Sequence, residues 1–273
     1  MPTVDAAQLR ARVDAVAFWW HSIDLGGGVV TPGVKTPDIL AAELEHLHLG
    51  DLRGKSVLDV GAYDGYFAFA AERLGADRVV ALDHYTWSMD LAGYEGYRRE
   101  RLARAEPIAA PDATAFWHPD TLPGRAGFDL VHEALDSKVE VVVADLLDCD
   151  LEALGSFDVV LYLGVLYHMR HPLLALERVA QVTRAGGRAI LETQAASFRA
   201  SEGRAMCQFI EGDDLNGDPT NWWVCNEPAL LAMCRAGGFE RAEMLRAPPL
   251  WQRRALANAK GTAPFRAFVR ADR

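Results

Sequence analysis

Three aspartates, each at the end of a short apolar run, carry the clearest chemical signal in this chain. Asp59 lies in "VLDVG", Asp83 closes "VVALD" and Asp145 closes "VVVAD". If the runs are parallel strands, their carboxyl ends share the sheet edge at which open α/β sheets bind ligands. A carboxylate at this edge could accept hydrogen bonds from ribose hydroxyls or from an exocyclic amine. Turn-forming aspartates at strand ends are the alternative interpretation.

A glycine loop, "GAYDGYF" at 61–67, follows the first aspartate. Gly61 permits a tight turn and a close approach of the backbone to a ligand. The spacing G-x-x-x-G differs from the G-x-G-x-x-G of dinucleotide sites. Three carboxylates at one edge would disfavour a pyrophosphate, so the pattern favours a nucleoside that carries a sulfonium cation and an amino group.

Two side chains beyond later strands could take part in proton transfer or substrate binding. His168 follows a predicted strand in "GVLYHMRH", and Glu192 ends "ILET". Transfer of a group to a hydroxyl needs a base near the reacting atom. His168 could instead begin a helix and bond only to the backbone, and Glu192 could bind a metal or a substrate hydroxyl. His118, in "FWHPD", could reach a substrate from a long connection.

Seven tryptophans are many for a chain of this length, and all lie outside the predicted strands. Aromatic side chains pack small cores, but they also stack on a sugar, a planar ring or a base. The candidates for such a stacking wall are Trp117, Trp222 and Trp223. The basic stretch 96–104 is typical of a solvated helix face, which favours a small neutral acceptor over a nucleic acid.

Strands and helices alternate along most of the chain. We expect helices at 66–75 and 172–187, and a helix-strand unit at 228–245. Continuous apolar strands separated by helices indicate a parallel sheet covered on both faces. The sequence therefore predicts a doubly wound, Rossmann-like α/β sheet of seven strands. Six of the strands are expected at 56–60, 78–83, 139–145, 157–164, 187–193 and 265–271.

Two long connections do not fit a minimal sheet. Residues 84–137 and 194–225 both leave the carboxyl ends of predicted strands, where long loops are often functional. We therefore expect two parts, namely N-terminal helices and a lid at 1–54, and a sheet domain with these insertions at 55–273.

The expected lid contains an unusual segment, "FWWHSIDLGGGVVTPG" at 18–33. We expect a helix over 3–20 that ends near His21, after which the glycines turn the chain over the sheet edge. His21 and Asp24 are candidates for contacting the acceptor or the donor, and simple packing is the alternative. A second helix should begin after Thr36, with this residue as the N-cap and Pro37 in the first turn.

Composition limits the classes of function. The chain has 273 residues, half of them hydrophobic, and a net charge of −10. An acidic chain lacks the electrostatic attraction to polyphosphate that most nucleic-acid binders show. No signal peptide or membrane span is apparent, so we expect a cytoplasmic protein. The cysteines form no C-x-x-C pair and are expected to be reduced, buried thiols; they are Cys149, Cys207, Cys225 and Cys234.

The motifs between residues 55 and 193 support a more specific interpretation. "VLDVGAYDGYF", "VVALD", "VVVADLLD", "FDVVLYLGVLYHMRHPLLALERV" and "GGRAILET" occur in this order. In order and spacing they resemble the motifs of class I S-adenosylmethionine (SAM)-dependent methyltransferases. With "HSIDLGGGVVTPG" and "NWWVCNEPALLAMCRAGGF", the chain resembles the tRNA wobble-uridine (mo5U34) methyltransferase-like family and its bacterial relatives.

The resemblance implies that SAM is the cofactor and that the glycine loop contacts its methionine part. It places Asp83 on the ribose, and Asp145 with Leu146 beside the adenine. It also places Leu163 and Tyr167 near the sulfonium. The residues expected to bind the cofactor are Asp59, Gly61, Tyr63, Asp64, Gly65, Asp83, His84, Asp145, Leu146, Leu163 and Gly164. The catalytic candidates are His168, Tyr167 and Glu192, and the substrate candidates are His21, Asp24, Trp117, His118, Trp222, Trp223 and Arg266.

Two features differ from the wobble-uridine family. Members that use a carboxylated form of SAM need basic residues upstream, whereas residues 18–34 contain no Lys or Arg and Lys35 is the first cation available. The connection 84–137 is also longer than the family pattern. We therefore expect an O-methyltransferase that acts on a small-molecule hydroxyl, such as that of a saccharide or glycosylated metabolite. The alternative is a tRNA wobble-uridine methyl or carboxymethyl transferase; a divalent metal such as Mg²⁺ and a homodimer are left open.

Overall fold

The computed structural model describes residues 5–199, 203–255 and 262–273. The chain divides into two compact units, Met1–Asp145 and Leu146–Arg273. In the described residues, no helix is both long enough and apolar enough to cross a membrane.

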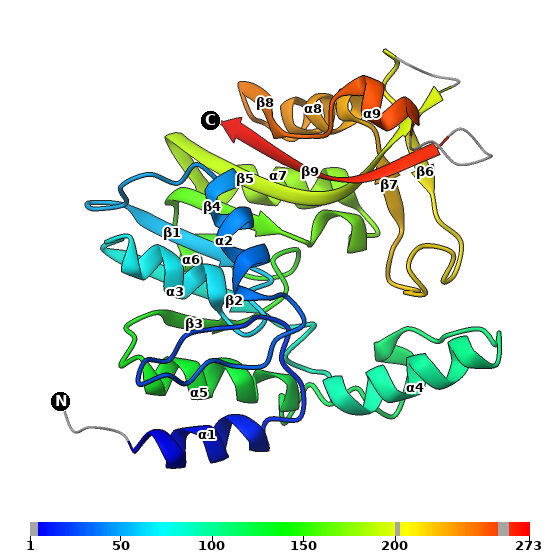
Figure 1. Ribbon diagram of the computed structural model, residues 1–273. Coiled ribbons are helices and arrows are strands. Elements are labelled where there is room, and N and C mark those ends of the chain that lie inside the picture. The colour runs from blue at the N-terminus through cyan, green and yellow to red at the C-terminus, as the bar shows by residue number, and fades with distance from the viewer. Residues whose placement is uncertain (1–4, 200–202, 256–261) are drawn as a thin grey trace. The chain divides into compact units, whose positions relative to one another are not determined.

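The first unit contains three parallel strands, in which β2 lies between β1 and β3 (Figure 1). Leu58 of β1 pairs with Val80 of β2, and Val80 pairs in turn with Glu140 of β3. β1 and β2 are almost fully buried, as their continuous apolar sequences require. The strands are β1 (Ser56–Val60), β2 (Arg78–Asp83) and β3 (Glu140–Val143).

Helices precede and connect these strands. The connection between β2 and β3 contains α4 and α5, and α4 includes the basic stretch, whose Arg98 forms an ion pair with Glu95 at 2.9 Å. Phe128 of α5 is fully buried against Phe69 of α3 and against Trp87. The helices are α1 (Ala6–Ala15), α2 (Pro37–His46), α3 (Tyr66–Arg73), α4 (Leu91–Ala103), η1 (Pro111–Ala113), η2 (Pro123–Arg125) and α5 (Ala126–Ala134).

The predicted ends of the N-terminal helices are partly wrong. α1 ends at Ala15, well before His21, and Val16 is already extended. The indole Nε1 of Trp19 donates a hydrogen bond to the carbonyl of Val13 at 3.1 Å, and Trp19 is buried. Burial of this ring therefore holds the chain in a turn where the sequence predicted continued helix. The predicted start of α2 is confirmed, with Thr36 as the N-cap and proline in the first turn.

The second unit is built on the long strand β5. It pairs in parallel with β4 and with β7, and antiparallel with β9, which also pairs with β8. β6 and β7 form an antiparallel pair. The strands are β4 (Phe157–Leu163), β5 (Thr183–Phe198), β6 (Cys207–Phe209), β7 (Trp223–Cys225), β8 (Arg241–Arg246) and β9 (Thr262–Asp272). The helices are α6 (Leu151–Leu154), η3 (Leu166–His168), α7 (Pro172–Val182), α8 (Glu227–Ala236) and α9 (Leu250–Ala255).

The α/β fold class is confirmed, and the structure adds detail in the second unit. β6 and β7 are additional to the seven predicted strands and fall in the predicted insertion 194–225, so Trp223 lies in a strand rather than outside the strands. The helix predicted to reach the glycines at 186 and 187 ends at Val182. Thr183 is buried and its hydroxyl donates to the carbonyl of Val179 at 2.7 Å, which closes the helix before β5 begins.

Two cysteines face one another across β6 and β7. Cys207 pairs in register with Cys225, and their sulfur atoms lie 2.6 Å apart. Cys225 and Cys234 are buried, as predicted, but Cys149 is only partly buried, and Cys207 is exposed because β6 lies at the surface of its unit. All four cysteines are free thiols.

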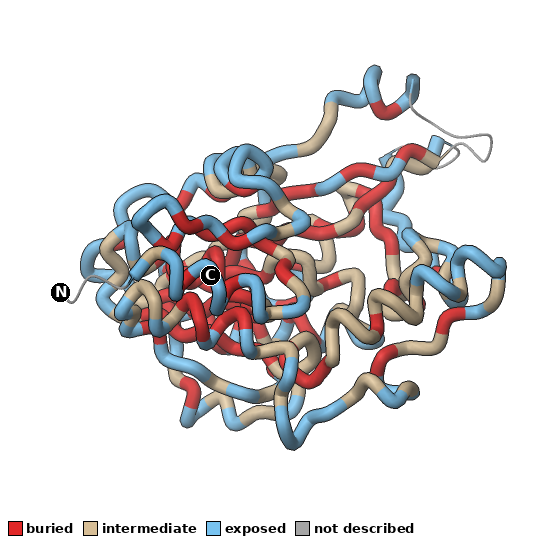
Figure 2. Tube along the Cα trace, turned by 60° about the horizontal axis from the view of Figure 1, so that its bottom comes forward, coloured by how far each residue is buried: buried red, intermediate tan, exposed pale blue. Residues whose placement is uncertain are grey.

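β1, β2 and β4 are largely buried, whereas β3 and β6 are mostly exposed, and Figure 2 shows the buried segments in red. Among the side chains that are less than 5% exposed are the carboxylates of Asp59, Asp64, Asp83 and Glu192. Buried carboxylates are costly unless they are hydrogen-bonded or paired. All four are predicted site residues, so their partners define the candidate site.

Candidate functional site

Asp83 ends β2, and both oxygens of its buried carboxylate accept hydrogen bonds. Its Oδ2 accepts hydrogen bonds from the backbone N–H of Tyr63 at 2.9 Å and from the hydroxyl of Thr86 at 2.5 Å. Its Oδ1 accepts from the N–H of Thr86 at 3.1 Å. Burial nevertheless raises the pKa of Asp83. A carboxylate offers about four acceptor positions, so Asp83 is held rigidly and can accept another donor.

The glycine loop before α3 has an unusual backbone. Gly61, Tyr63 and Gly65 all have positive φ angles, of 75°, 55° and 88°. A side chain at Gly65 would also collide with rings, because its Cβ would lie 2.4 Å from Phe69 and 2.7 Å from Phe128. Tyr63 is a non-glycine residue in a costly conformation, which is typical of functional sites.

Asp59 lies in β1 and has an unsatisfied oxygen. Its side chain is buried, and within the described part of the chain its Oδ2 has no hydrogen-bond partner. Burial raises the pKa of Asp59 to about 7; a backbone hydrogen bond from Ala68 opposes the shift and the charge of Asp83 adds to it. Buried polar atoms are almost always paired in native proteins, so this oxygen fits a ligand that brings an N–H donor.

Asp64 binds the N-terminal segment rather than presenting a free carboxylate. Its Oδ2 accepts from the backbone N–H groups of Trp20 and His21, each at 2.9 Å, and its Oδ1 contacts Nδ1 of His21. His21 is buried beside Tyr63 and Phe67. The segment is therefore fastened to the glycine loop, which gives both Asp64 and His21 an anchoring role that the sequence did not predict.

The remaining site candidates of the first unit have mixed surroundings. Asp24 is exposed and accepts a hydrogen bond from Gly26 N at 2.9 Å, as a turn residue does. The structure brings His84 and Trp117 together, with ring centroids 5.6 Å apart. His118 is exposed, and Asp145 lies exposed just beyond β3.

In the second unit, Glu192 of β5 and Arg266 of β9 form a two-pronged ion pair, Nε to Oε1 and Nη2 to Oε2. Glu192 is buried, whereas the Arg266 side chain is 40% exposed. The guanidinium lies over the ring of Tyr167, 5.0 Å from its centroid. Glu192 and Tyr167, both predicted to be catalytic, therefore form one cluster with Arg266, which was predicted to bind the substrate.

Gly164 marks the centre of this cluster, directly after Leu163 at the end of β4. A Cβ at Gly164 would lie 3.8 Å from Oε2 of Glu192 and 3.9 Å from both Nη2 of Arg266 and the hydroxyl of Tyr167. Its N–H donates to the carbonyl of Glu192 at 2.8 Å. Burial raises the pKa of Tyr167, although Arg266 opposes the shift. Tyr167 is therefore a neutral hydrogen-bonding group at physiological pH.

His168 ends η3 beside this cluster, with its ring 4.2 Å from that of Tyr167. Its Nδ1 lies 2.8 Å from the hydroxyl and 3.2 Å from the carbonyl oxygen of Thr220. Burial lowers the pKa of His168, and the charge of Asp218 opposes this shift. The ring is therefore neutral near pH 7 and able to accept a proton.

Trp222 and Trp223 come shortly after Thr220, the hydrogen-bond partner of His168, in the chain. The N–H of Trp222 donates to the carbonyl of Tyr167 at 2.8 Å, and the guanidinium of Arg170 lies 4.4 Å from the centroid of a Trp222 ring. Trp223 packs edge-on to Phe209, with centroids 5.4 Å apart. The pair is thus fixed to η3 and partly exposed, as a stacking surface requires.

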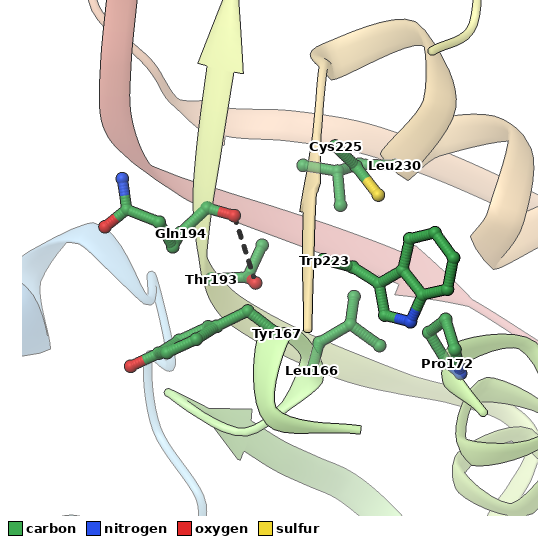
Figure 3. Close-up of a pocket in the computed structure, with 8 residues that line it drawn as sticks. All are labelled: Leu166, Tyr167, Pro172, Thr193, Gln194, Trp223, Cys225 and Leu230. Atoms are coloured by element: carbon green, nitrogen blue, oxygen red, sulfur yellow. Dashed lines mark hydrogen bonds between the residues drawn. The ribbon is translucent and has the colours of Figure 1, made fainter. Parts of the chain in front are cut away.

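A small pocket lies beside Trp223 (Figure 3). Its volume is about 10 Å³, which is room for about one water molecule. In Figure 3 the Tyr167 hydroxyl points away from Trp223. The pocket is too small for a substrate and belongs to the packing of this unit; it is lined by Leu166, Tyr167, Pro172, Thr193, Gln194, Trp223, Cys225 and Leu230.

The sequence did not indicate Thr86, Arg170, Asp218 or Thr220. Thr86 could have been suspected because it lies three residues beyond Asp83. Asp218 and Thr220 stand in "DPTNWW", directly before the predicted tryptophan pair. Within the described residues, no three His, Cys, Asp or Glu side chains come together as metal ligands. Leu146 is buried, and its carbonyl accepts from Arg178 at 3.0 Å.

Comparison with known proteins gives the family. A family model described as a methyltransferase domain matches residues 36–244. The tRNA U34 carboxymethyltransferase of Marinobacter nauticus is 28% identical over 200 residues, which cover 72% of this chain and 48% of that protein. The protein of the same name from Pseudomonas aeruginosa is 30% identical over 193 residues, covering 70% and 47%. The chain spans about half the length of these curated relatives.

Solved structures give the same fold. The N-terminal domain of EvdMO1, crystallised in the presence of SAH and D-fucose, superposes with a TM-score of 0.57 at 20% sequence identity. The match covers 98% of this chain and 97% of that domain. The predicted α/β fold class and the predicted methyltransferase family are confirmed. The chain belongs to the methyltransferase-domain family.

Proposed function

We propose that this protein is a SAM-dependent O-methyltransferase that acts on a hydroxyl of a small molecule, with a saccharide or glycosylated metabolite as the acceptor class. We assign binding of the methyl donor to the first unit, and handling of the acceptor hydroxyl to the second. When bound, SAM supplies a methyl group activated by its sulfonium. All other steps depend on groups of this chain.

The first unit supplies donors and acceptors that suit SAM. Asp83 would accept the ribose hydroxyls, and the unpaired Oδ2 of Asp59 would accept from the α-amino group. The open backbone at Gly61 permits close approach of the methionine part. Asp145 is the proposed partner of the adenine amine. The buried, unsatisfied oxygen of Asp59 is the feature of this unit that most directly calls for a ligand.

Proton removal from the acceptor is assigned to His168, and this is the observation that carries the proposal of O-methylation. The ring is neutral because burial lowers its pKa, and its Nδ1 is occupied by Thr220, which leaves Nε2 to act as the base. Hydroxyl acceptors require such a base, typically worth about 10²–10⁴-fold in rate.

The saccharide class rests on the groups around the base. Glu192, Arg266 and Tyr167 combine acceptors and donors that could orient several hydroxyls at once. Trp222 and Trp223 offer aromatic faces, which often pack against sugars. The EvdMO1 domain, which has the same fold, was crystallised in the presence of D-fucose, in line with this choice.

Incubation with SAM carrying a deuterated methyl group tests the proposal. The acceptors are free hexoses and deoxyhexoses, nucleotide-linked sugars and unmodified tRNA, each analysed by mass spectrometry. We expect a single labelled methyl ether on a sugar, and loss of this product in His168→Ala. Label on tRNA alone, or on nitrogen or carbon atoms, would contradict the proposal.

The second candidate is a tRNA wobble-uridine transferase, favoured by the curated relatives. One observation weighs against a carboxylated donor. Lys35, the first cation after the lid segment, is already paired with Glu43 at 2.7 Å, and both side chains are mostly buried. Mass spectrometry of wobble nucleosides from a deletion strain tests this candidate, because unchanged 5-oxyuridine derivatives would exclude it.

A further inference from the structure

Asp218, Thr220 and His168 form a hydrogen-bonded chain whose proton positions can be deduced. The Thr220 hydroxyl lies 2.6 Å from Oδ1 of Asp218 and 2.8 Å from Nδ1 of His168. An ionised carboxylate only accepts hydrogen bonds, so the hydroxyl donates its proton to Asp218. The same hydroxyl must then accept from His168, which requires a proton on Nδ1. The Thr220 carbonyl, 3.2 Å from Nδ1, favours the same tautomer.

The segment that carries Asp218 and Thr220 is itself held in place. The backbone N–H of Thr220 donates to Oδ1 of Asp218 at 2.9 Å, and the amide side chain of Asn221 donates to the carbonyl of Leu215 at 2.8 Å. Next in the chain, the N–H of Trp222 donates to the carbonyl of Tyr167 at 2.8 Å. Both ends of the relay are therefore fixed relative to η3.

We propose that Asp218 and Thr220 are positioning residues that fix His168 with its proton on Nδ1, so that Nε2 is always the atom that takes the acceptor's proton. The proposal rests on the proposed function and deepens it. The O–H bond of the acceptor would break as Nε2–H forms, and the oxygen's electron pair would bond to the methyl carbon. The S–CH3 bond of the donor would break in the same step, and its electron pair would stay on the sulfur, which leaves as a neutral thioether. The imidazolium formed in this step is stabilised by Asp218 through Thr220.

Charged groups on several elements influence the protonation of the His168 ring. Asp218, on the loop before β7, favours the imidazolium, and Arg266 of β9 opposes it. Glu192 of β5 is already engaged by Arg266, and Tyr167 lies against the ring as a neutral group. Asp218 is therefore the group whose removal should change the acid–base behaviour of His168 most directly.

Nitrogen-15 NMR of the His168 imidazole tests the relay without any acceptor. The variants are Asp218→Asn, which can reverse the hydrogen bond to Thr220, and Thr220→Val, which removes the hydroxyl. Thr220→Ser restores the hydroxyl, and Asp214→Asn removes an exposed carboxylate of the same loop. We expect the Nδ1–H tautomer in wild type, Thr220→Ser and Asp214→Asn, and a shift toward Nε2–H in Asp218→Asn. The same tautomer in Asp218→Asn as in wild type would overturn the proposal.

Steady-state kinetics with the acceptor that the labelling experiment identifies provides the second readout. We expect kcat to fall about 10- to 100-fold in Asp218→Asn and Thr220→Val, with KM nearly unchanged and rescue by Thr220→Ser. The acid limb of the pH–rate profile should move to lower pH, because loss of the carboxylate makes His168 harder to protonate. An unmoved limb, or no rescue by serine, would contradict the proposal. If His168→Ala keeps full activity, the proposed base is wrong, whereas the tautomer result stands independently.

Discussion

The two units use different means to place their functional groups. In the first unit, Asp83 binds backbone and side-chain donors of residues that lie 20 and 3 positions away, and the loop between them depends on positive φ angles. In the second, Glu192 meets Arg266 across 74 positions and His168 meets Thr220 across 52. The proposed donor site therefore depends mainly on local backbone geometry, and the proposed acceptor site on side chains that only the tertiary fold brings together.

The largest effect should come from the second unit. His168→Ala should lower kcat about 10²–10⁴-fold and leave the affinity for SAH unchanged, because the ring acts on the acceptor. Steady-state kinetics and calorimetry measure the two quantities. His171→Ala is the matched control, since His171 is exposed and its side chain makes no capping hydrogen bond. A parallel loss of SAH affinity in His168→Ala would remove the distinction between the units.

Gly65→Ala should damage the first unit through folding rather than rate. The new Cβ would meet Phe69 and Phe128 at 2.4 and 2.7 Å, at a φ of +88°. We expect a loss of about 2–5 kcal/mol in the free energy of unfolding, from strain of the core and of the backbone. Gly26→Ala has a similar φ of +81° but open space around it, so it reports the backbone cost alone. If chemical denaturation shows equal losses of unfolding free energy in Gly65→Ala and Gly26→Ala, the contacts with the two phenylalanine rings do not contribute.

Asp59→Asn should stabilise the free protein in a pH-dependent way. The folded-state pKa of Asp59 is about 7, above the usual value near 4. Between pH 4 and pH 7 the folded state therefore keeps a proton that the unfolded state has already lost. The free energy of unfolding falls as the pH rises through this range. The gain from asparagine should therefore grow from pH 4 to pH 7 and level off above it. Thermal denaturation across this range measures it, with Asp120→Asn as an exposed control. A gain that does not vary with pH would exclude an elevated pKa.

The smallest predicted effect is confined to the N-terminal segment around Trp20 and His21. Asp64→Ala removes the acceptor of the Trp20 and His21 amides, and each hydrogen bond to a charged group contributes about 1.5–3 kcal/mol. These two amides should exchange with deuterium faster by about ten-fold or more, while those of β1 stay protected. Asp77→Ala, which removes the acceptor of the Gly54 amide in the same unit, is the control. Unchanged exchange at Trp20 and His21 would show that the segment is held by packing alone.

The separation along the chain between a residue and its partners explains how much could be predicted. Asp59 and Asp83 lie at or near the ends of β1 and β2, and the glycine loop follows β1 directly, so apolar runs and turn residues located them. The link between Asp64 and the N-terminal segment was missed because its partners are 43 and 44 residues apart. Asp218 and Thr220 were missed because nothing in "GDPT" indicates which histidine it will contact. The helix ends at Ala15 and Val182 depended on burial of Trp19 and Thr183, which local propensity does not report.

Isothermal titration with SAH tests the central claim most directly, namely that donor binding depends on the carboxylates of the first unit and acceptor chemistry on the polar cluster of the second. Asp83→Asn should weaken binding about 10- to 100-fold, from the loss of charge-assisted hydrogen bonds to the ribose. His168→Ala and Glu192→Gln should bind SAH like the wild type. Wild-type affinity in Asp83→Asn, or no SAH binding by the unmodified protein, would contradict the account.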